Sequence, residues 1–128
     1  MKLSQTRVGV LAVLTVCLFC VVILARPRGA RTLKGIYQTG PEQSAFFVDG
    51  DCSKRPFWFT WPDQLDKDSE KRLWSVGRPE ALRLKVRASV SPEGKYGHLQ
   101  GYPREVQVLE VISVDAATPC PWPGERRK

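Results

Sequence analysis

A long apolar segment near the start of the chain limits everything after it to one small domain. Residues 8–25 read VGVLAVLTVCLFCVVILA, carry no charge, and include Thr15 as the one clearly polar residue. A helix rises about 1.5 Å per residue, so this segment would span roughly 27 Å, enough for the core of a bilayer. About 100 residues then remain, which is sufficient for one hydrophobic core.

The residues around this segment favour an uncleaved membrane anchor. Lys2 and Arg7 precede the segment, which is longer than the apolar core of most signal peptides. Cleavage after Ala25 would fall directly before Arg26–Pro27, a poor context for cleavage. Secretion after signal cleavage stays as the alternative, and lipid attachment at Cys17 is a third option.

Basic residues on both sides of the apolar segment leave the positive-inside rule undecided. The short basic start still resembles an export signal, so we expect a single pass through the inner (cytoplasmic) membrane. The domain would face the periplasm or exterior, with residues 8–25 in the lipid bilayer. The expected divisions are a signal-anchor at 1–25, a basic linker at 26–31, the folded domain at 32–115 and a Pro-rich basic tail at 116–128.

The net charge of +7 is concentrated near the ends of the chain. Nine of the 20 basic residues are Lys2, Arg7, Arg26, Arg28, Arg31, Lys34, Arg126, Arg127 and Lys128. Residues 35–124 contain the remaining 11 basic residues and 12 acidic residues, which gives that region a charge of −1. A nucleic-acid-binding domain concentrates positive charge on its folded surface, so we do not expect nucleic acid as a partner. Anionic lipid fits this distribution better.

Two cysteines, Cys52 and Cys120, follow the apolar segment. In an exported domain such a pair favours a disulfide, which would close a loop of roughly 70 residues worth about 4 kcal/mol. Two free thiols are the alternative for a cytoplasmic domain. A metal site that includes His98 is a further alternative, but the chain lacks paired ligand spacing. We therefore expect no metal and no cofactor.

Five segments have the alternation, or the β-branched and aromatic residues, of strands. They are residues 32–39, 44–49, 56–61, 81–90 and 104–114. In the third segment, Phe57, Phe59 and Trp61 share one face and are expected to fill the core, while Trp58 lies on the other face. In the fifth, alternation breaks near Leu109–Glu110, and a β-bulge there would return Val111 or Ile112 to the core.

One helix is expected at 63–77, between the third and fourth strands. Its largely apolar face consists of Leu65, Ser69, Leu73 and Val76. Asp63 is the expected N-cap, and Gly77 suits the position that ends a helix. The predicted fold is therefore mostly β, in the order β-β-β-α-β-β. That is the order of an OB-fold, a small Greek-key barrel, here preceded by one transmembrane helix.

Two stretches resemble a known family. GIYQTGPEQSAFFVDGDC (35–52) resembles the opening hairpin, and ASVSPEGKYGHLQGYPREVQVLEVISV (88–114) the last hairpin, of the C-terminal OB domain of NlpE-type bacterial envelope lipoproteins. The resemblance implies an exported OB domain tethered to a membrane, with no enzyme activity. The chain lacks a good lipobox and a domain before the OB part, so a sensor role does not carry over.

No catalytic motif is recognisable, because His98 is the only histidine and no serine has the sequence context of a nucleophile. We therefore expect no enzyme. The expected function is a non-catalytic, membrane-anchored, extracytoplasmic OB-like domain that acts in envelope binding or as an assembly accessory. An envelope protein or a glycan is the candidate partner.

The alternative is an OB module that binds oligonucleotides or oligosaccharides through outer-face aromatic and basic residues. The candidate ligand-binding residues are Trp58, Arg83, Lys85, Arg87, Tyr96, His98 and Tyr102. The three basic residues form a stripe on the outer face of the fourth strand, which pairing with acids such as Glu105 would also explain. His98 lies with both tyrosines between the fourth and fifth strands, either in a structural turn or in a binding loop.

Overall fold

Five strands and one α-helix follow each other in the predicted order in the computed structural model, which describes residues 29–122. The elements are β1 (Arg31–Gly40), β2 (Gln43–Val48), β3 (Phe57–Thr60), α2 (Lys67–Ser75), β4 (Ala81–Val90), the 3-10 helix η1 (His98–Gln100) and β5 (Glu105–Ala117). The predicted anchor at 8–25 lies outside the described residues. Between residues 29 and 122, no helix is long and apolar enough to cross a bilayer.

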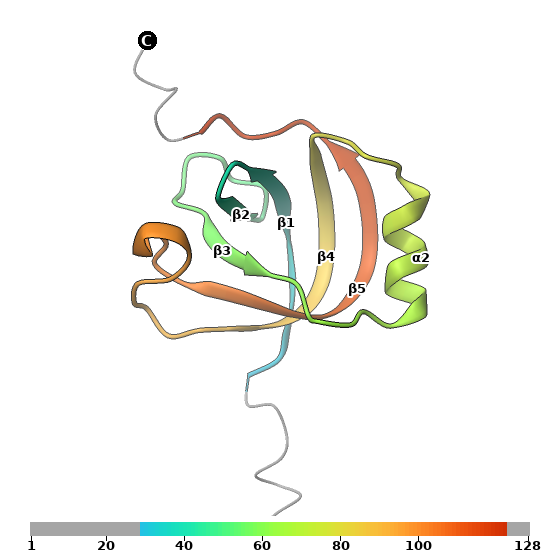
Figure 1. The fold of residues 1–128 in the computed structure, drawn as a ribbon, viewed down its shortest axis with the longest axis horizontal. Coiled ribbons are helices and arrows are strands. Elements are labelled where there is room, and N and C mark those ends of the chain that lie inside the picture. Colours follow the sequence, from blue (N-terminus) through green and yellow to red (C-terminus); the bar gives the residue numbers. More distant parts are fainter. Residues whose placement is uncertain (1–28, 123–128) are drawn as a thin grey trace, which may run out of the picture.

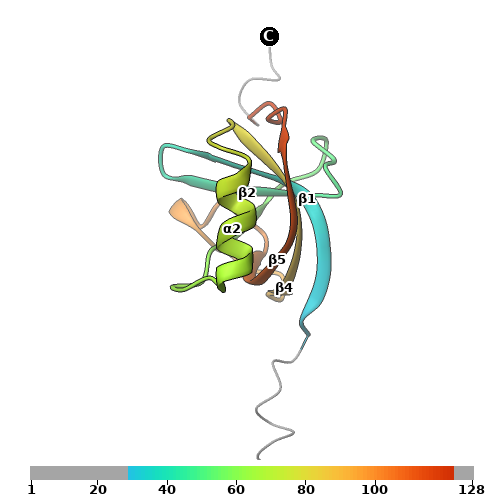
Figure 2. The same cartoon turned by 90° about the vertical axis from the view of Figure 1, so that its right-hand side faces the viewer.

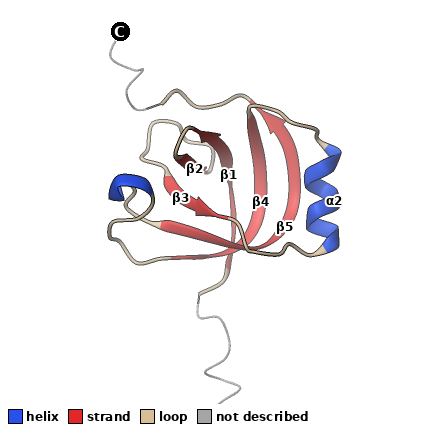
Figure 3. Ribbon diagram, in the orientation of Figure 1, coloured by secondary structure: helices blue, strands red, loops and turns tan. Residues whose placement is uncertain are grey.

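The strands close into a barrel in the order β1-β2-β3-β5-β4, with β4 returning to β1. Only the β3–β5 pair is parallel, and the other four pairs are antiparallel. Figures 1 and 3 show α2 outside the barrel, at the end opposite η1. The prediction of a mostly β barrel with one helix between the third and fourth strands is confirmed.

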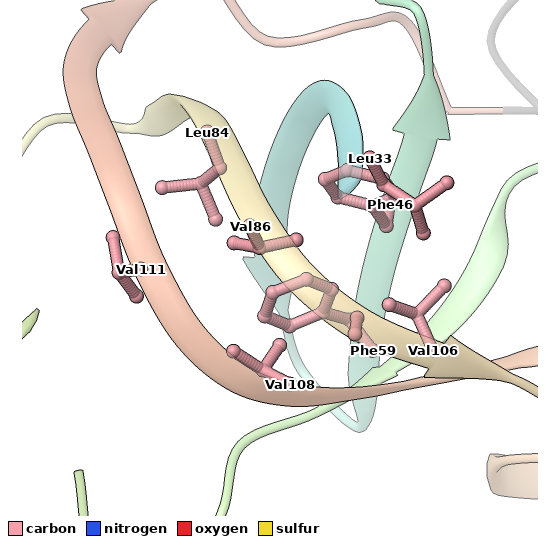
Figure 4. Close-up of a cluster of buried hydrophobic side chains, with 9 residues drawn as sticks. Leu33, Phe46, Phe59, Leu84, Val86, Val106, Val108 and Val111 are labelled. Carbon is pink, nitrogen blue, oxygen red and sulfur yellow. The ribbon is translucent and has the colours of Figure 1, made fainter. Parts of the chain in front are cut away.

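The barrel interior is a close-packed apolar core contributed by all five strands (Figure 4). Its buried members are Leu33, Phe46, Phe59, Leu84, Val86, Ala88, Val106, Val108 and Val111. Phe59 is 2% exposed, and Phe57 and Trp61 pack against the same cluster. These three aromatic residues therefore face inward, as the alternation of the third strand predicts.

A second, smaller apolar cluster lies on the outer face of β1 and β2. Its buried members are Ile36, Ala45, Phe47, Ala81 and Cys120. It is covered by the chain after β5, residues 118–122, here called the tail. The predicted disulfide between Cys52 and Cys120 is present, with a Cα–Cα distance of 5.4 Å. The disulfide therefore fixes the tail to the β2–β3 loop.

A buried side chain on β1 also binds the tail. Gln38 is 2% exposed, and its Nε2 donates to the Cys120 carbonyl at 2.9 Å. The Cys120 N–H in turn donates to Gln38 Oε1 at 2.6 Å. Because both polar groups of the amide are satisfied, burying Gln38 carries no desolvation penalty from an unpaired group.

The predicted irregularity in the last strand is confirmed. The β4–β5 register shifts twice, so that Ile112 and Leu109 each fall between paired residues. Val111, paired with Val86, returns to the core and is fully buried. Side chains of α2 bind both backbone polar groups of Val111. The Val111 N–H donates to Ser69 Oγ at 2.8 Å, and Arg72 Nη1 donates to the Val111 carbonyl at 2.9 Å. Figure 2 shows α2 in front of β5.

The predicted N-cap at Asp63 is wrong. The cap is Asp66, whose carboxylate accepts from the Ser69 N–H at 2.9 Å. Ser69 is fully buried against β5, which fixes the first turn of α2 at Lys67 and puts Asp66 in the capping position. Gly77, with φ of +73°, follows the helix in the left-handed conformation expected for it.

The cap makes α2 sensitive to acid. Hydrogen bonds from the side chain and backbone of Ser69 lower the pKa of Asp66. A carboxylate with a lowered pKa in the folded state contributes its stability above its unfolded pKa, near pH 4, and loses it as pH falls through the folded value. We expect Asp66→Asn to reduce the loss of stability between pH 5 and about pH 2, measured by urea unfolding. Asp63→Asn, the control, should follow the parent protein, and an unchanged profile for Asp66→Asn would contradict the assignment.

Candidate functional site

A groove of about 350 Å³ opens where the turn between β1 and β2 meets the loop between β4 and β5. Glu42 belongs to the turn, Gln43 is the first residue of β2, and Arg55 and Pro56 belong to the β2–β3 loop. The β4–β5 loop, residues 91–104, contributes His98, Leu99, Gly101 and Tyr102, and the tail contributes Trp122. Four segments distant in sequence therefore form one concave surface.

The β4–β5 loop is held in shape by its own backbone. Tyr96 and Tyr102 form an isolated antiparallel bridge, with N–H to carbonyl distances of 2.9 and 3.2 Å. The Gly94 N–H donates to the Pro103 carbonyl at 2.9 Å. The Tyr96 hydroxyl donates to the Pro92 carbonyl at 2.9 Å, so it is used within the loop. The loop thus continues the β4–β5 hairpin as a twisted, hydrogen-bonded extension.

The loop covers Trp58, which lies on the outer face of β3 opposite Ala45 of β2. The rings of Trp58 and Tyr102 meet at 5.2 Å between centroids and 66° between planes. A Cβ added at Gly97 would lie 2.3 Å from the Trp58 ring, so only glycine permits this approach. Trp58 is therefore a support for the loop and does not line the groove.

Gly97→Ala is expected to displace the loop from Trp58. Gly97 has φ 70° and ψ −167°, a region that only glycine occupies readily, and strain there costs about 1–3 kcal/mol before the clash is counted. We expect a loss of about 2 kcal/mol in the free energy of unfolding and a red shift of tryptophan fluorescence. Gly101→Ala in the same loop is the control, because its Cβ would meet only the His98 carbonyl, at 3.8 Å. Equal behaviour of the two variants would contradict this assignment.

A contact between the side chains of His98 and Glu42 joins the two sides of the groove. His98 Nε2 lies 3.0 Å from Glu42 Oε2. Backbone conformations on both sides are unusual for non-glycine residues, with φ of +57° at Glu42 and +54° at Leu99. Such conformations cost free energy and are concentrated at functional sites. His98 is therefore bound to a carboxylate at the groove.

The rest of the groove combines apolar surface with one available cation. Leu99 is 87% exposed, which is unusual for a large aliphatic side chain. Arg55 Nη2 donates to the Gly101 carbonyl at 3.0 Å, and Arg55 makes no ion pair within residues 29–122. Partial burial raises the pKa of Tyr102, so its hydroxyl stays neutral and able to donate at physiological pH. An apolar lining with a few polar groups is typical of ligand sites.

The predicted basic stripe lies elsewhere. Arg83, Lys85 and Arg87 follow the outer face of β4, and none of them lines the groove. Arg87 pairs with Glu110 at 3.2 Å, not with Glu105. The bulges in β5 bring Glu110 opposite Arg87, whereas Glu105 lies beyond the end of β4 and accepts a hydrogen bond from Thr60.

Of the seven residues predicted to bind ligand, His98 and Tyr102 line the groove. Trp58 and Tyr96 instead support the β4–β5 loop. Sequence reasoning missed Glu42, Arg55, Leu99 and Trp122. Of these four residues, only Trp122 could have been predicted from the sequence. It follows Cys120 by two residues, and the predicted disulfide holds this part of the tail against the barrel. The others needed the closed topology, which brings the turn and the two loops together.

Among residues 29–122, no group of three or more histidine, cysteine, aspartate or glutamate side chains is placed to hold a metal ion. Every buried side-chain polar atom in this part of the chain has a hydrogen-bond partner. No protein-family model matches the chain, and comparisons with curated proteins and with solved structures give no match either.

Proposed function

We propose that this protein is a non-catalytic binding domain built on an OB-fold and tethered to the inner membrane through residues 8–25. The domain lies on the periplasmic or exterior side of the membrane and acts in envelope binding or as an assembly accessory, as the NlpE-type resemblance implies. The observation that carries the proposal is the groove between the β1–β2 turn and the β4–β5 loop. These two loops flank the ligand face of OB-folds. The strand order and the helix between β3 and β4 support the same assignment.

The chain's own segments explain why the ligand would bind at the groove. OB-folds bind ligands on the outer face of β2 and β3. Here the tail covers Ala45 and Phe47 on β2, while the β4–β5 loop covers Trp58 on β3. The groove at the rim of this covered face is the concave surface left for a ligand.

The chemistry of the groove favours a small ligand, or the end of a chain, with one apolar face and one polar or anionic group. Leu99, Tyr102 and Trp122 offer apolar and aromatic contact. Arg55 offers a cation, and the Glu42–His98 pair offers hydrogen-bonding groups. This combination would orient a bound molecule in the groove.

The disulfide supports the placement outside the cytoplasm, because structural disulfides persist in oxidising compartments. The test is to isolate membranes with the full-length protein, extract them with alkaline carbonate, and alkylate thiols before and after reduction. We expect the protein to stay in the membrane fraction and Cys52 and Cys120 to be labelled only after reduction. Release by carbonate would overturn the tether, and labelling without reduction would overturn the oxidising location.

The groove is tested by measuring how detergent-solubilised full-length protein binds envelope glycans and peptides. Leu99→Ala and Arg55→Ala should each weaken binding roughly tenfold, since each removes a group with a direct ligand contact. Arg78→Ala, an exposed arginine that does not line the groove, is the control for Arg55 and should bind as the parent does. Binding that survives both groove substitutions would place the ligand elsewhere.

The second candidate function is a module that binds oligosaccharides or oligonucleotides. It is favoured by Tyr102 and Trp122, because aromatic rings can stack on bases and sugars. Titration with glycans and with single-stranded DNA should quench tryptophan fluorescence, and Trp122→Phe should remove most of the change. A response of equal size in Trp122→Phe would argue against a stacking role at the groove.

A further inference from the structure

The outer face of β1 and β4 brings two lysines directly opposite each other. Lys34 on β1 and Lys85 on β4 are partners in the antiparallel register. The next pair along, Leu33 and Val86, is buried in the barrel core, so both lysines point outward. Arg83 and Arg87 lie on the same outer face, two residues to either side of Lys85. These four cations are here called the basic face.

Within residues 29–122, most of the basic face is not neutralised. The side chains of Lys34, Arg83 and Lys85 make no hydrogen bond or ion pair with this part of the chain. Asp115 is the register partner of Arg83, yet no ion pair forms between them. The backbone N–H of Asp49 donates to the Lys34 carbonyl, but the Asp49 carboxylate makes no ion pair with the Lys34 side chain. Only Arg87 is paired, with Glu110 at 3.2 Å. Like charges directly opposite each other on a sheet destabilise it, so a negatively charged partner would relieve a real repulsion.

The basic face lies close to the proposed tether. β1 begins at Arg31, and five residues, 26–30, separate it from the apolar segment that ends at Ala25. Six extended residue steps span at most about 20 Å, so the start of β1 cannot lie far from the membrane surface. Thr32, next after Arg31, is the register partner of Arg87. The basic face therefore starts where the chain would leave the bilayer.

We infer that the basic face rests on the anionic phospholipid surface of the membrane that holds the tether. This inference depends on the proposed membrane tether. Lysine and arginine side chains near an anionic leaflet are attracted to it, and Arg26 and Arg28 would add to the attraction. Nucleic acid is the other polyanion that could bind such a face. It is disfavoured because residues 35–124 together carry a charge of −1.

The test is lysine acetylation with a water-soluble reagent on the full-length protein in lipid nanodiscs, read by mass spectrometry. In discs with about one-third anionic phospholipid, Lys34 and Lys85 should react roughly fivefold more slowly than in purely zwitterionic discs. Lys71, exposed on α2, is the internal control and should react equally in both. Salt at about 0.5 M should remove most of the protection, because it screens charges beyond a few ångströms.

Arg83→Glu adds a charge reversal within the basic face without removing a side-chain hydrogen bond or ion pair seen in residues 29–122. It should abolish the protection of Lys34 and Lys85, while Lys71→Glu, with the same change in charge, should leave it intact. Protein that enters the discs but shows unprotected Lys34 and Lys85 overturns the inference and leaves the tether standing. Protein that fails to enter the discs overturns both. Equal protection by single-stranded RNA in zwitterionic discs would assign the face to nucleic acid instead.

Discussion

Replacing Cys52 and Cys120 together by serine is expected to lower the free energy of unfolding by about 2–5 kcal/mol. The disulfide closes a loop with a sequence separation of 68, so its loss gives the unfolded chain more freedom. Its loss also weakens the hold on the tail, which covers Ile36 and Phe47 on the outer face of β1 and β2. Urea unfolding of the full-length protein in detergent, with and without reductant, measures the change.

The control for this prediction is Cys17→Ser with Cys20→Ser, which also removes two cysteines but leaves the disulfide intact. It should unfold like the parent protein. Reductant should lower the stability of the parent and of this control, but not that of the variant lacking Cys52 and Cys120. If that variant stays within about 0.5 kcal/mol of the parent, the disulfide is not a major source of stability.

Phe46→Ala is expected to destabilise the barrel by about 3–5 kcal/mol. Phe46 is fully buried, and its ring stacks on Phe59 with centroids 5.2 Å apart. Its ring also fills the space beside Gly35, where an added Cβ would lie 2.7 Å from the ring. Removing the ring would leave a cavity bounded by β1, β2 and β3, which the closed barrel can collapse only in part.

Trp74→Ala is the matched control for Phe46→Ala. Trp74 is also aromatic, but it is 67% exposed on α2. Its removal should change the free energy of unfolding by less than about 0.5 kcal/mol. Thermal and urea unfolding of both variants would measure the difference. A loss below about 1 kcal/mol for Phe46→Ala would contradict the description of the core.

The local pattern of the sequence is sufficient to predict the strands and their order along the chain. The alternation from Ala81 to Val90 predicted β4 with both its ends. The aromatic segment at 56–61 predicted which side of β3 faces inward, because Phe57, Phe59 and Trp61 lie at a spacing of two. The interruption near Leu109–Glu110 predicted the bulge that buries Val111. Each of these features depends on neighbours in sequence, and sequence periodicity reports such features directly.

The features that sequence reasoning missed depend on contacts between distant segments. Phe46 and Phe47 are adjacent and both buried, since Phe47 lies under the tail on the outer face. Alternation alone would expose one of them. The helix cap is Asp66 and not the predicted Asp63, because the hydrogen bond between Ser69 and β5 determines where the helix begins. The groove joins Glu42, Arg55 and Trp122, which only barrel closure and the disulfide bring together.

The return of β4 to β1 has a consequence for how other proteins can bind this one. Each of the five strands is hydrogen-bonded to a strand on both sides over at least part of its length, and α2 binds Val111 of β5 beyond the short β3–β5 pairing. The barrel in residues 31–117 therefore has no strand with one side unpaired along its whole length, which is the edge that an added peptide strand or an identical copy would use. We therefore expect a partner to recognise mainly side chains and loops, and mutations of surface residues to change its affinity more than mutations that alter strand pairing.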